Sequence, residues 1–105
     1  MVVDEIHELL ATPRPDKAEP FLERLDATLT AGYAQALQLE AERWRLERRL
    51  GEVARSVEGA DGSSFVEELA ALAKRLTSAD GELTKLRSLL GSLHERTRSA
   101  RLAAG

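Results

Sequence analysis

Apolar residues recur at alternating spacings of three and four along two long stretches of the chain. In residues 21–57 they fall on the a and d positions of a heptad repeat. These positions are Leu22, Leu25, Leu29, Gly32, Ala36, Leu39, Arg43, Leu46, Leu50, Val53 and Val57. A helix places such a series on one face, as in the seam of a coiled coil. We therefore expect one long helix here, with Arg43 as the charged member of its seam.

The same alternation returns in residues 64–102. The second seam is formed by Phe65, Leu69, Leu72, Leu76, Ala79, Leu83, Leu86, Leu90, Leu93, Thr97 and Ala100. A turn is predicted over residues 58–63, because the two glycines in this segment end helices and favour turns. Ser64 and Glu67 match the Ser-x-x-Glu capping box that opens a helix, with Ser63 as an alternative cap. The second helix is therefore expected to span residues 64–102.

Size matching between the two seams predicts how the helices pair. When the chain is folded at the turn, every seam residue of the first helix faces a seam residue of the second. Gly32 then lies opposite Leu90, and Arg43 lies opposite Ala79, so that large residues meet small ones. Arg43 and Ala79 are expected to select the register, because a polar seam residue lowers stability but favours one alignment. The predicted fold is all-α, a long antiparallel helical hairpin over residues 21–102.

The N-terminal part of the chain differs from the hairpin. Residues 1–11 carry apolar side chains at helical spacing and are expected to form a short helix. About three turns are too few for a stable helix in isolation. Residues 12–20 hold all three prolines and are predicted to be a stiff linker, with Pro20 in the first turn of the next helix. The sequence does not decide whether residues 2–10 dock on the hairpin or on a partner.

A second set of apolar side chains falls on the b and e positions, beside the seam. This set is Tyr33, Leu37, Trp44, Ala54, Val66, Ala70 and Ala73. An exposed tryptophan near a tyrosine and a leucine is typical of an interface. In the simplest alternative, Trp44 lies along its own helix and is covered by its neighbours. As an interface, the set could be covered by residues 2–10, by a foreign helix or by a second copy. Its small residues favour a face-to-face homodimer that forms a four-helix bundle.

Most chemical functions are not supported by the residues. The chain has no cysteine, and its net charge of −3 argues against nucleic-acid binding. His7 and His94 lack metal-ligand spacing, and no glycine-rich phosphate loop is present. We expect no catalytic residues, no metal and no cofactor, and therefore no enzyme. The first residues lack the pattern of a signal peptide and no apolar run could span a membrane, so a cytoplasmic protein is expected.

One basic cluster supports an alternative function. Arg45, Arg48 and Arg49 lie close to Trp44 and could bind an anionic ligand such as a cyclic dinucleotide. Helical spacing is taken to place Trp44 on one face and Arg45 and Arg48 on the other, which favours a solvated arginine face. The layout resembles that of small antiparallel-hairpin anti-sigma factors that sense cyclic di-GMP. Their spaced Glu, Ser, Arg, Gln and Asp signature does not appear here. The bias toward Ala, Leu, Arg and Glu points to a bacterial protein. The first hypothesis remains a structural or regulatory interaction protein that forms a homodimer through Tyr33, Leu37 and Trp44.

Overall fold

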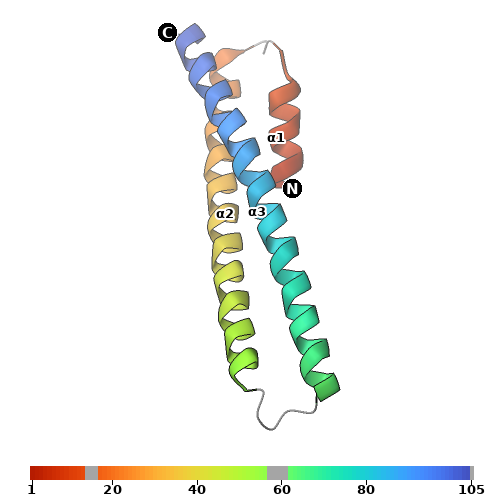
Figure 1. The fold of residues 1–105 in the computed structure, drawn as a ribbon. Coiled ribbons are helices and arrows are strands. Elements are labelled where there is room, and N and C mark those ends of the chain that lie inside the picture. Colours follow the sequence, from red (N-terminus) through yellow and green to blue (C-terminus); the bar gives the residue numbers. More distant parts are fainter. Residues whose placement is uncertain (14–16, 57–61, 105) are drawn as a thin grey trace. The chain divides into compact units, whose positions relative to one another are not determined.

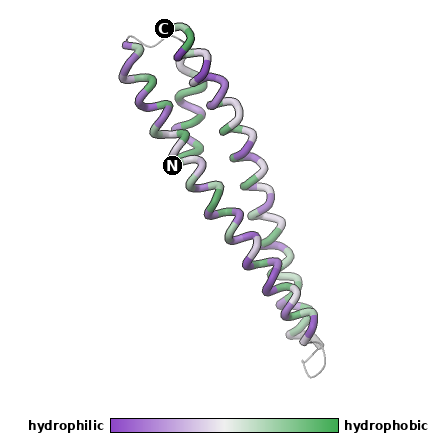
Figure 2. Tube along the Cα trace, turned by 90° about the vertical axis from the view of Figure 1, so that its left-hand side faces the viewer, coloured by the Kyte–Doolittle hydropathy of each residue, from purple (hydrophilic) through white to green (hydrophobic). Residues whose placement is uncertain are grey.

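The computed structural model describes residues 1–13, 17–56 and 62–104. These residues form the helices α1 (Val2–Ala11), α2 (Ala18–Arg55) and α3 (Gly62–Ala104), with no strand among them (Figure 1). Hydrophobic positions recur between hydrophilic ones along the helices (Figure 2). Within the described part of the chain, no helix carries an apolar stretch long enough to cross a membrane.

Both long helices begin earlier than the sequence indicated. α2 begins at Ala18 instead of residue 21, which makes Pro20 its third residue. The first four N–H groups of a helix have no partner within the helix, so a proline anywhere in this turn removes no hydrogen bond. α3 begins at Gly62 instead of residue 64, so Ser63 and Ser64 lie inside its first turn and not at its cap. The expected capping box at Ser64 is therefore wrong.

The ends of the first two helices also have local causes. Thr12 follows α1, and its hydroxyl donates a hydrogen bond of 2.9 Å to the carbonyl oxygen of Glu8. α2 ends at Arg55, two residues before the expected end, and the hydroxyl of Ser56 donates to the carbonyl of Val53 over 3.0 Å. Both carbonyls lie in the last turn of their helix, where carbonyls lack a regular helical partner, and that of Val53 also accepts the backbone N–H of Ser56 over 3.1 Å. The expected turn over residues 58–63 and the linker over 12–20 lie partly outside the described residues.

The chain divides into two compact units. Unit 1 is made of Met1–Leu37 and Thr84–Gly105, and unit 2 is Gln38–Leu83. Unit 1 therefore contains α1, the first half of α2 and the second half of α3. The core of unit 1 is formed by Ile6, Leu9, Phe21, Leu25, Leu29, Ala36, Leu86, Leu90 and Leu93. Unit 2 contains only the second half of α2 and the first half of α3.

Within unit 1, the segments of α2 and α3 run antiparallel. A Cβ atom added to Gly32 would overlap the side chain of Leu90, so these two residues share a layer, as expected. Arg101, further along α3, donates to Asp26, which lies earlier on α2. Both Asp26 and Arg101 occupy e positions, and an antiparallel pair brings e positions together on one edge.

Within unit 2, the two segments are also antiparallel. The core is formed by Leu46, Val53, Leu72 and Ala79, with Leu50, Phe65, Leu69 and Leu76 packed against it. The guanidinium of Arg49 donates to Glu68 over 2.8 Å, and Arg43 donates to Asp80 over 3.0 Å. Arg49 and Glu68 occupy g positions, each directly before an a position. The g edge of unit 2 is therefore a charged edge.

Candidate interaction surfaces

The apolar b and e residues that the sequence assigned to an interface are called the stripe from here on. Those that belong to unit 1 are exposed. Tyr33 is 49% exposed and Leu37 is 66% exposed, whereas their neighbour Ala36 is buried in the seam. Helical spacing explains this contrast, since e and b positions turn progressively away from the seam. Unit 1 therefore presents two large apolar side chains, one turn apart, outside its core.

The other stripe residues belong to unit 2 and come from both of its helices. Trp44 is 58% exposed and Val66 is 61% exposed. The smaller side chains of Ala54, Ala70 and Ala73 are also exposed. All the residues that the sequence assigned to an interface thus lie outside the core, in two groups that belong to the two units.

Arg48 is a neighbour of Trp44, which the sequence analysis did not expect. The guanidinium of Arg48 lies over the indole ring, 4.8 Å from its centroid. Arg48 and Trp44 are four residues apart and so share a face of the helix, which corrects the expectation that they lie on opposite faces. Because more than half of the tryptophan remains exposed, this contact covers only part of the ring.

The basic cluster does not converge on one point. Arg49 binds Glu68 on α3 and lies 3.7 Å from Glu52 on its own helix. Arg48 stacks on Trp44, and Arg45 is exposed. An anion would be bound most tightly by guanidiniums that point at the same place. Arg49 is directed to carboxylates instead, which leaves Arg45 and Arg48 as the anion-binding candidates.

Arg43 uses its seam position to reach carboxylates at the edge of unit 2. Its Nη1 lies 3.0 Å from Oδ1 of Asp80, and its Nε lies 3.8 Å from Oε1 of Glu47. Ala79, the small residue expected opposite Arg43, is buried. The long side chain of Arg43 thus leaves the seam where α3 offers a small residue, and its charge meets acidic partners.

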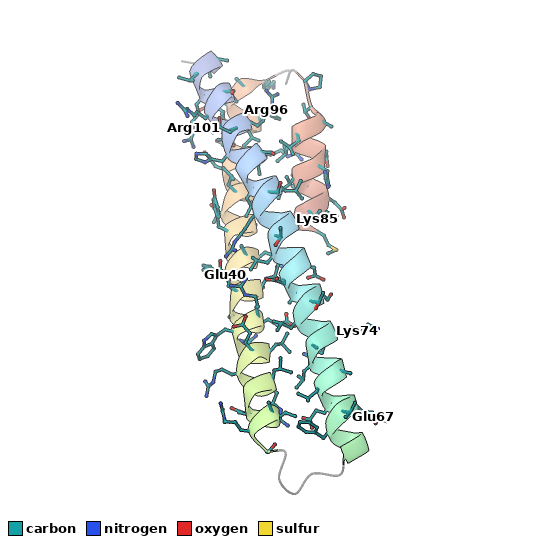
Figure 3. All side chains as sticks on the ribbon, viewed as in Figure 1. Glu40, Glu67, Lys74, Lys85, Arg96 and Arg101 are labelled. Carbon is teal, nitrogen blue, oxygen red and sulfur yellow. The ribbon has the colours of Figure 1, made fainter. Side chains whose placement is uncertain are left out.

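The docking of α1 was not predicted. Arg24 on α2 lies 2.6 Å from Glu5 and 3.5 Å from Glu8 on α1. The hydrogen bond and the charge of Glu5 raise the pKa of Arg24. Arg96 on α3, labelled in Figure 3, donates to the carbonyl of Thr12 over 2.7 Å. α1 therefore packs within unit 1, against both α2 and α3.

The side of unit 1 that receives α1 is the g edge. Phe21 and Thr28 on α2 are buried there, and Leu89 and Arg96 on α3 are half-buried. This g edge lies on the other flank of the α2 seam from Tyr33, an e residue. Residues 2–10 thus dock on the chain itself and leave Tyr33 and Leu37 uncovered. A sequence signal existed, since the g positions of unit 1 include one charged residue, Arg96, whereas those of unit 2 are mostly charged.

Three of the hollows in the described part of the chain lie beside these surfaces. One, of about 360 Å³, lies in unit 1 beside Phe21, whose ring is 5.4 Å from the Arg96 guanidinium carbon. A second in unit 1, of about 250 Å³, is lined by residues that include His94, Arg98 and Arg101. The third, in unit 2, is about 210 Å³ and is lined by Glu42, Arg75, Ser78, Ala79 and Glu82. Among the described residues, no group of three or more His, Cys, Asp or Glu side chains could hold a metal ion.

No protein-family model, no curated protein and no solved structure matches this chain. The function proposed below therefore rests on the exposed and buried residues of the chain itself.

Proposed function

We propose that this chain is a non-enzymatic protein–protein interaction module, a scaffold or regulatory adaptor that assembles with a second copy of itself. In this proposal, the antiparallel pairing found in each unit continues as one helical hairpin. The continuity of α2 (Ala18–Arg55) and α3 (Gly62–Ala104) supports this. Two hairpins then pack face to face as a four-helix bundle.

The exposure of the stripe is the observation that carries this proposal. Tyr33, Leu37 and Trp44 are large apolar side chains that share a face of α2 by helical spacing and are about half exposed or more. α1, the chain's own candidate to cover them, is docked elsewhere. Apolar stripes of this kind are typical of binding surfaces, and aromatic residues contribute strongly to them.

The small residues of the stripe favour a helical partner. Ala54, Ala70 and Ala73 are exposed in unit 2 and leave room for a second helix to approach closely. Trp44 and Val66 supply the larger side chains that fill the remaining space. Alternation of large and small residues allows helix faces to interdigitate, and a two-fold interface would repeat this match twice.

Substitution of two stripe residues tests the homodimer. Leu37→Glu combined with Trp44→Glu should convert a dimer into a monomer, because both side chains would leave the interface. Burial of a leucine contributes about 1.5–3 kcal/mol and is lost twice at a two-fold interface, so the dissociation constant should rise at least about 100-fold. Light scattering after gel filtration measures the mass, and circular dichroism should show unchanged helix content.

Leu102→Glu is the matched control, since Leu102 is also a strongly exposed leucine but lies off the stripe. This variant should dimerise like the wild type. A wild-type protein that is monomeric at high micromolar concentration contradicts the homodimer.

A second candidate function is the binding of a small anionic ligand, such as a cyclic dinucleotide. It is supported by Arg48, which stacks on a Trp44 ring that remains accessible. A base or phosphate could extend this stack, with Arg45 nearby on the helix. Calorimetry with cyclic dinucleotides should then show binding that Arg45→Ala/Arg48→Ala abolishes and that Lys74→Ala preserves. Absence of heat with the wild type at high micromolar concentration contradicts this function.

A further inference from the structure

In unit 1, α1 lies against the g edge of α2 and α3, and we call the surface that it covers the groove. Ile6 and Leu9 of α1 are completely buried, although neither belongs to the seam between α2 and α3. Val2 lies near Gly32, so contact with the long helices extends to the first turn of α1. A helix of 10 residues thus inserts two aliphatic anchors, three positions apart, beside the seam.

Charge complements this apolar contact. Glu5 precedes the first anchor and Glu8 precedes the second, and both carboxylates lie within 3.5 Å of the Arg24 guanidinium. At the other end of α1, Arg96 donates to the carbonyls of Thr12 and Pro13, over 2.7 and 3.2 Å. The groove therefore has apolar walls, a basic residue beside the middle of α1 and another beyond its C-terminal end, and its occupant is an acidic amphipathic helix.

The physical properties of α1 make it an exchangeable occupant. A helix of this length has little stability of its own in water, so its order depends on docking. It has no side-chain hydrogen bond at its N-terminal cap. Its advantage over a competitor is that it is tethered to the groove, and a short tether supplies an effective concentration on the order of millimolar.

We propose that this groove is a helix-binding site that also accepts a helix in trans, with α1 as its resident competitor. The partner is an acidic amphipathic helix that carries two aliphatic anchors at i and i+3 and carboxylates at i−1 and i+2, the pattern of Ile6, Leu9, Glu5 and Glu8. The site lies on a different edge of unit 1 from Tyr33 and Leu37. It is therefore a second interaction surface, whose occupancy does not require the homodimer.

The experiment uses the full chain and measures fluorescence anisotropy of a labelled, C-terminally amidated peptide of residues 1–13, as a stand-in for the partner helix. In the full-length variant Ile6→Ala/Leu9→Ala, the resident helix loses its two anchors while the groove is unchanged. This variant should bind the peptide at least tenfold more tightly than the wild type does, because the tethered competitor has been weakened.

A second, milder variant is used in case Ile6→Ala/Leu9→Ala does not fold. Glu5→Lys/Glu8→Lys in the full chain alters one partly exposed and one exposed side chain and no core residue, so it should stay folded while its resident helix is repelled by Arg24. It should also bind the wild-type peptide more tightly than the wild-type chain does. A second peptide, with only the two anchors and the two carboxylates on an alanine and glutamine background, should bind as well. A peptide that carries Ile6→Ala/Leu9→Ala should not.

Charge reversal locates the binding site. Arg24→Glu, introduced into the Ile6→Ala/Leu9→Ala chain, should weaken peptide binding roughly threefold, as expected for exposed ion pairs. A peptide with Glu5→Lys/Glu8→Lys should restore the affinity for this variant. Arg98→Glu makes the same change in net charge on another edge of unit 1 and should have no effect.

Three outcomes overturn the proposal. The first is no peptide binding at high micromolar concentration by both weakened variants, with circular dichroism that shows them folded. The second is binding that Arg24→Glu and Arg98→Glu weaken equally, which places the peptide elsewhere on a charged surface. The third is a wild-type dimer that dissociates in Ile6→Ala/Leu9→Ala, which assigns the groove to α1 of a second copy.

Discussion

Unit 1 and unit 2 are built on the same heptad seam but bury different amounts of it. In unit 1, the d residues Leu25, Leu86 and Leu93 are at most 2% exposed, whereas in unit 2 the d residues Leu46, Val53 and Leu72 are 4–8% exposed. The a residues Leu50, Leu69 and Leu76 of unit 2 are only half-buried. In unit 1 a third helix, α1, covers the g edge, which flanks the d residues, and unit 2 contains no such helix. Two helices shield only the contact between them, and a third covers the edge that they leave open.

The g positions decide where the third helix packs. In unit 1 they include Phe21, Thr28 and Leu89, which can be buried without an unpaired charge. In unit 2 they include Arg49 and Glu68, which bind each other across the edge. Burial of such charges under another helix would require their desolvation, which is costly. The seam thus directs the pairing of the long helices, and the g positions direct where a third helix can pack against the pair.

The largest expected effect comes from giving unit 1 the g positions of unit 2. Phe21→Glu combined with Leu89→Glu should release α1, because removal of a buried phenylalanine alone costs about 3–5 kcal/mol. Hydrogen exchange of residues 2–11 should then become fast, while α2 and α3 stay protected. Gln35→Glu is the control, since this g residue of unit 1 is exposed and its substitution should leave α1 protected. Retained protection of α1 in the double variant contradicts the role of the g edge.

A smaller effect is expected from glycine substitutions that probe the packing of unit 1. Gly32→Ala places a Cβ atom against the buried Leu90 side chain, and overpacking costs about 1–3 kcal/mol. Alanine gains about 1 kcal/mol in helix propensity, so a net loss of roughly 1 kcal/mol is expected. Gly91→Ala, where the added Cβ meets no atom within 4 Å, should instead stabilise the protein by about 0.5–1 kcal/mol. Urea denaturation measures both, and equal shifts in the two variants would contradict the close approach at Gly32.

The smallest effect is expected at the charged g edge of unit 2. Arg49→Ala removes the contact with Glu68, in which both side chains are about half exposed. Exposed pairs of this kind contribute about 0–1 kcal/mol, and salt screens them. The destabilisation should therefore be below about 1 kcal/mol at low salt and should shrink in 1 M NaCl. Lys74→Ala, an exposed substitution on α3, is the comparison. A loss above about 2 kcal/mol for Arg49→Ala would show that this edge contributes as much as an apolar one.

Much of the local structure could be predicted from the sequence. The spacing of apolar residues indicated three helices, and size matching placed Gly32 against Leu90. Arg43 was expected in the seam opposite a small residue, Ala79, and its guanidinium contacts Asp80, the next residue of α3. Both long helices begin two or three residues earlier than expected, because residues of a first turn need no partner within the helix for their N–H groups.

The exposed stripe could also be predicted, since its residues fall outside the a and d positions. Exposure of Tyr33, Leu37 and Trp44 follows from this spacing. The error over Arg48 was avoidable, because residues four apart share a helix face and Arg48 does lie over Trp44. Spacing alone does not indicate the edge on which the short helix α1 docks.

The long helices and the pairing of their segments within each unit could be predicted because the heptad pattern repeats along the chain. Each heptad favours the same structure, and many weak preferences add up. The place of α1 depends on few residues that are far apart in the chain. Phe21 and Thr28 meet Leu89 and Arg96 on one edge only after α2 and α3 have aligned antiparallel within unit 1. That residues 2–11 cover this edge follows from the folded chain alone, because burial of Ile6 and Leu9 requires walls from both long helices at once.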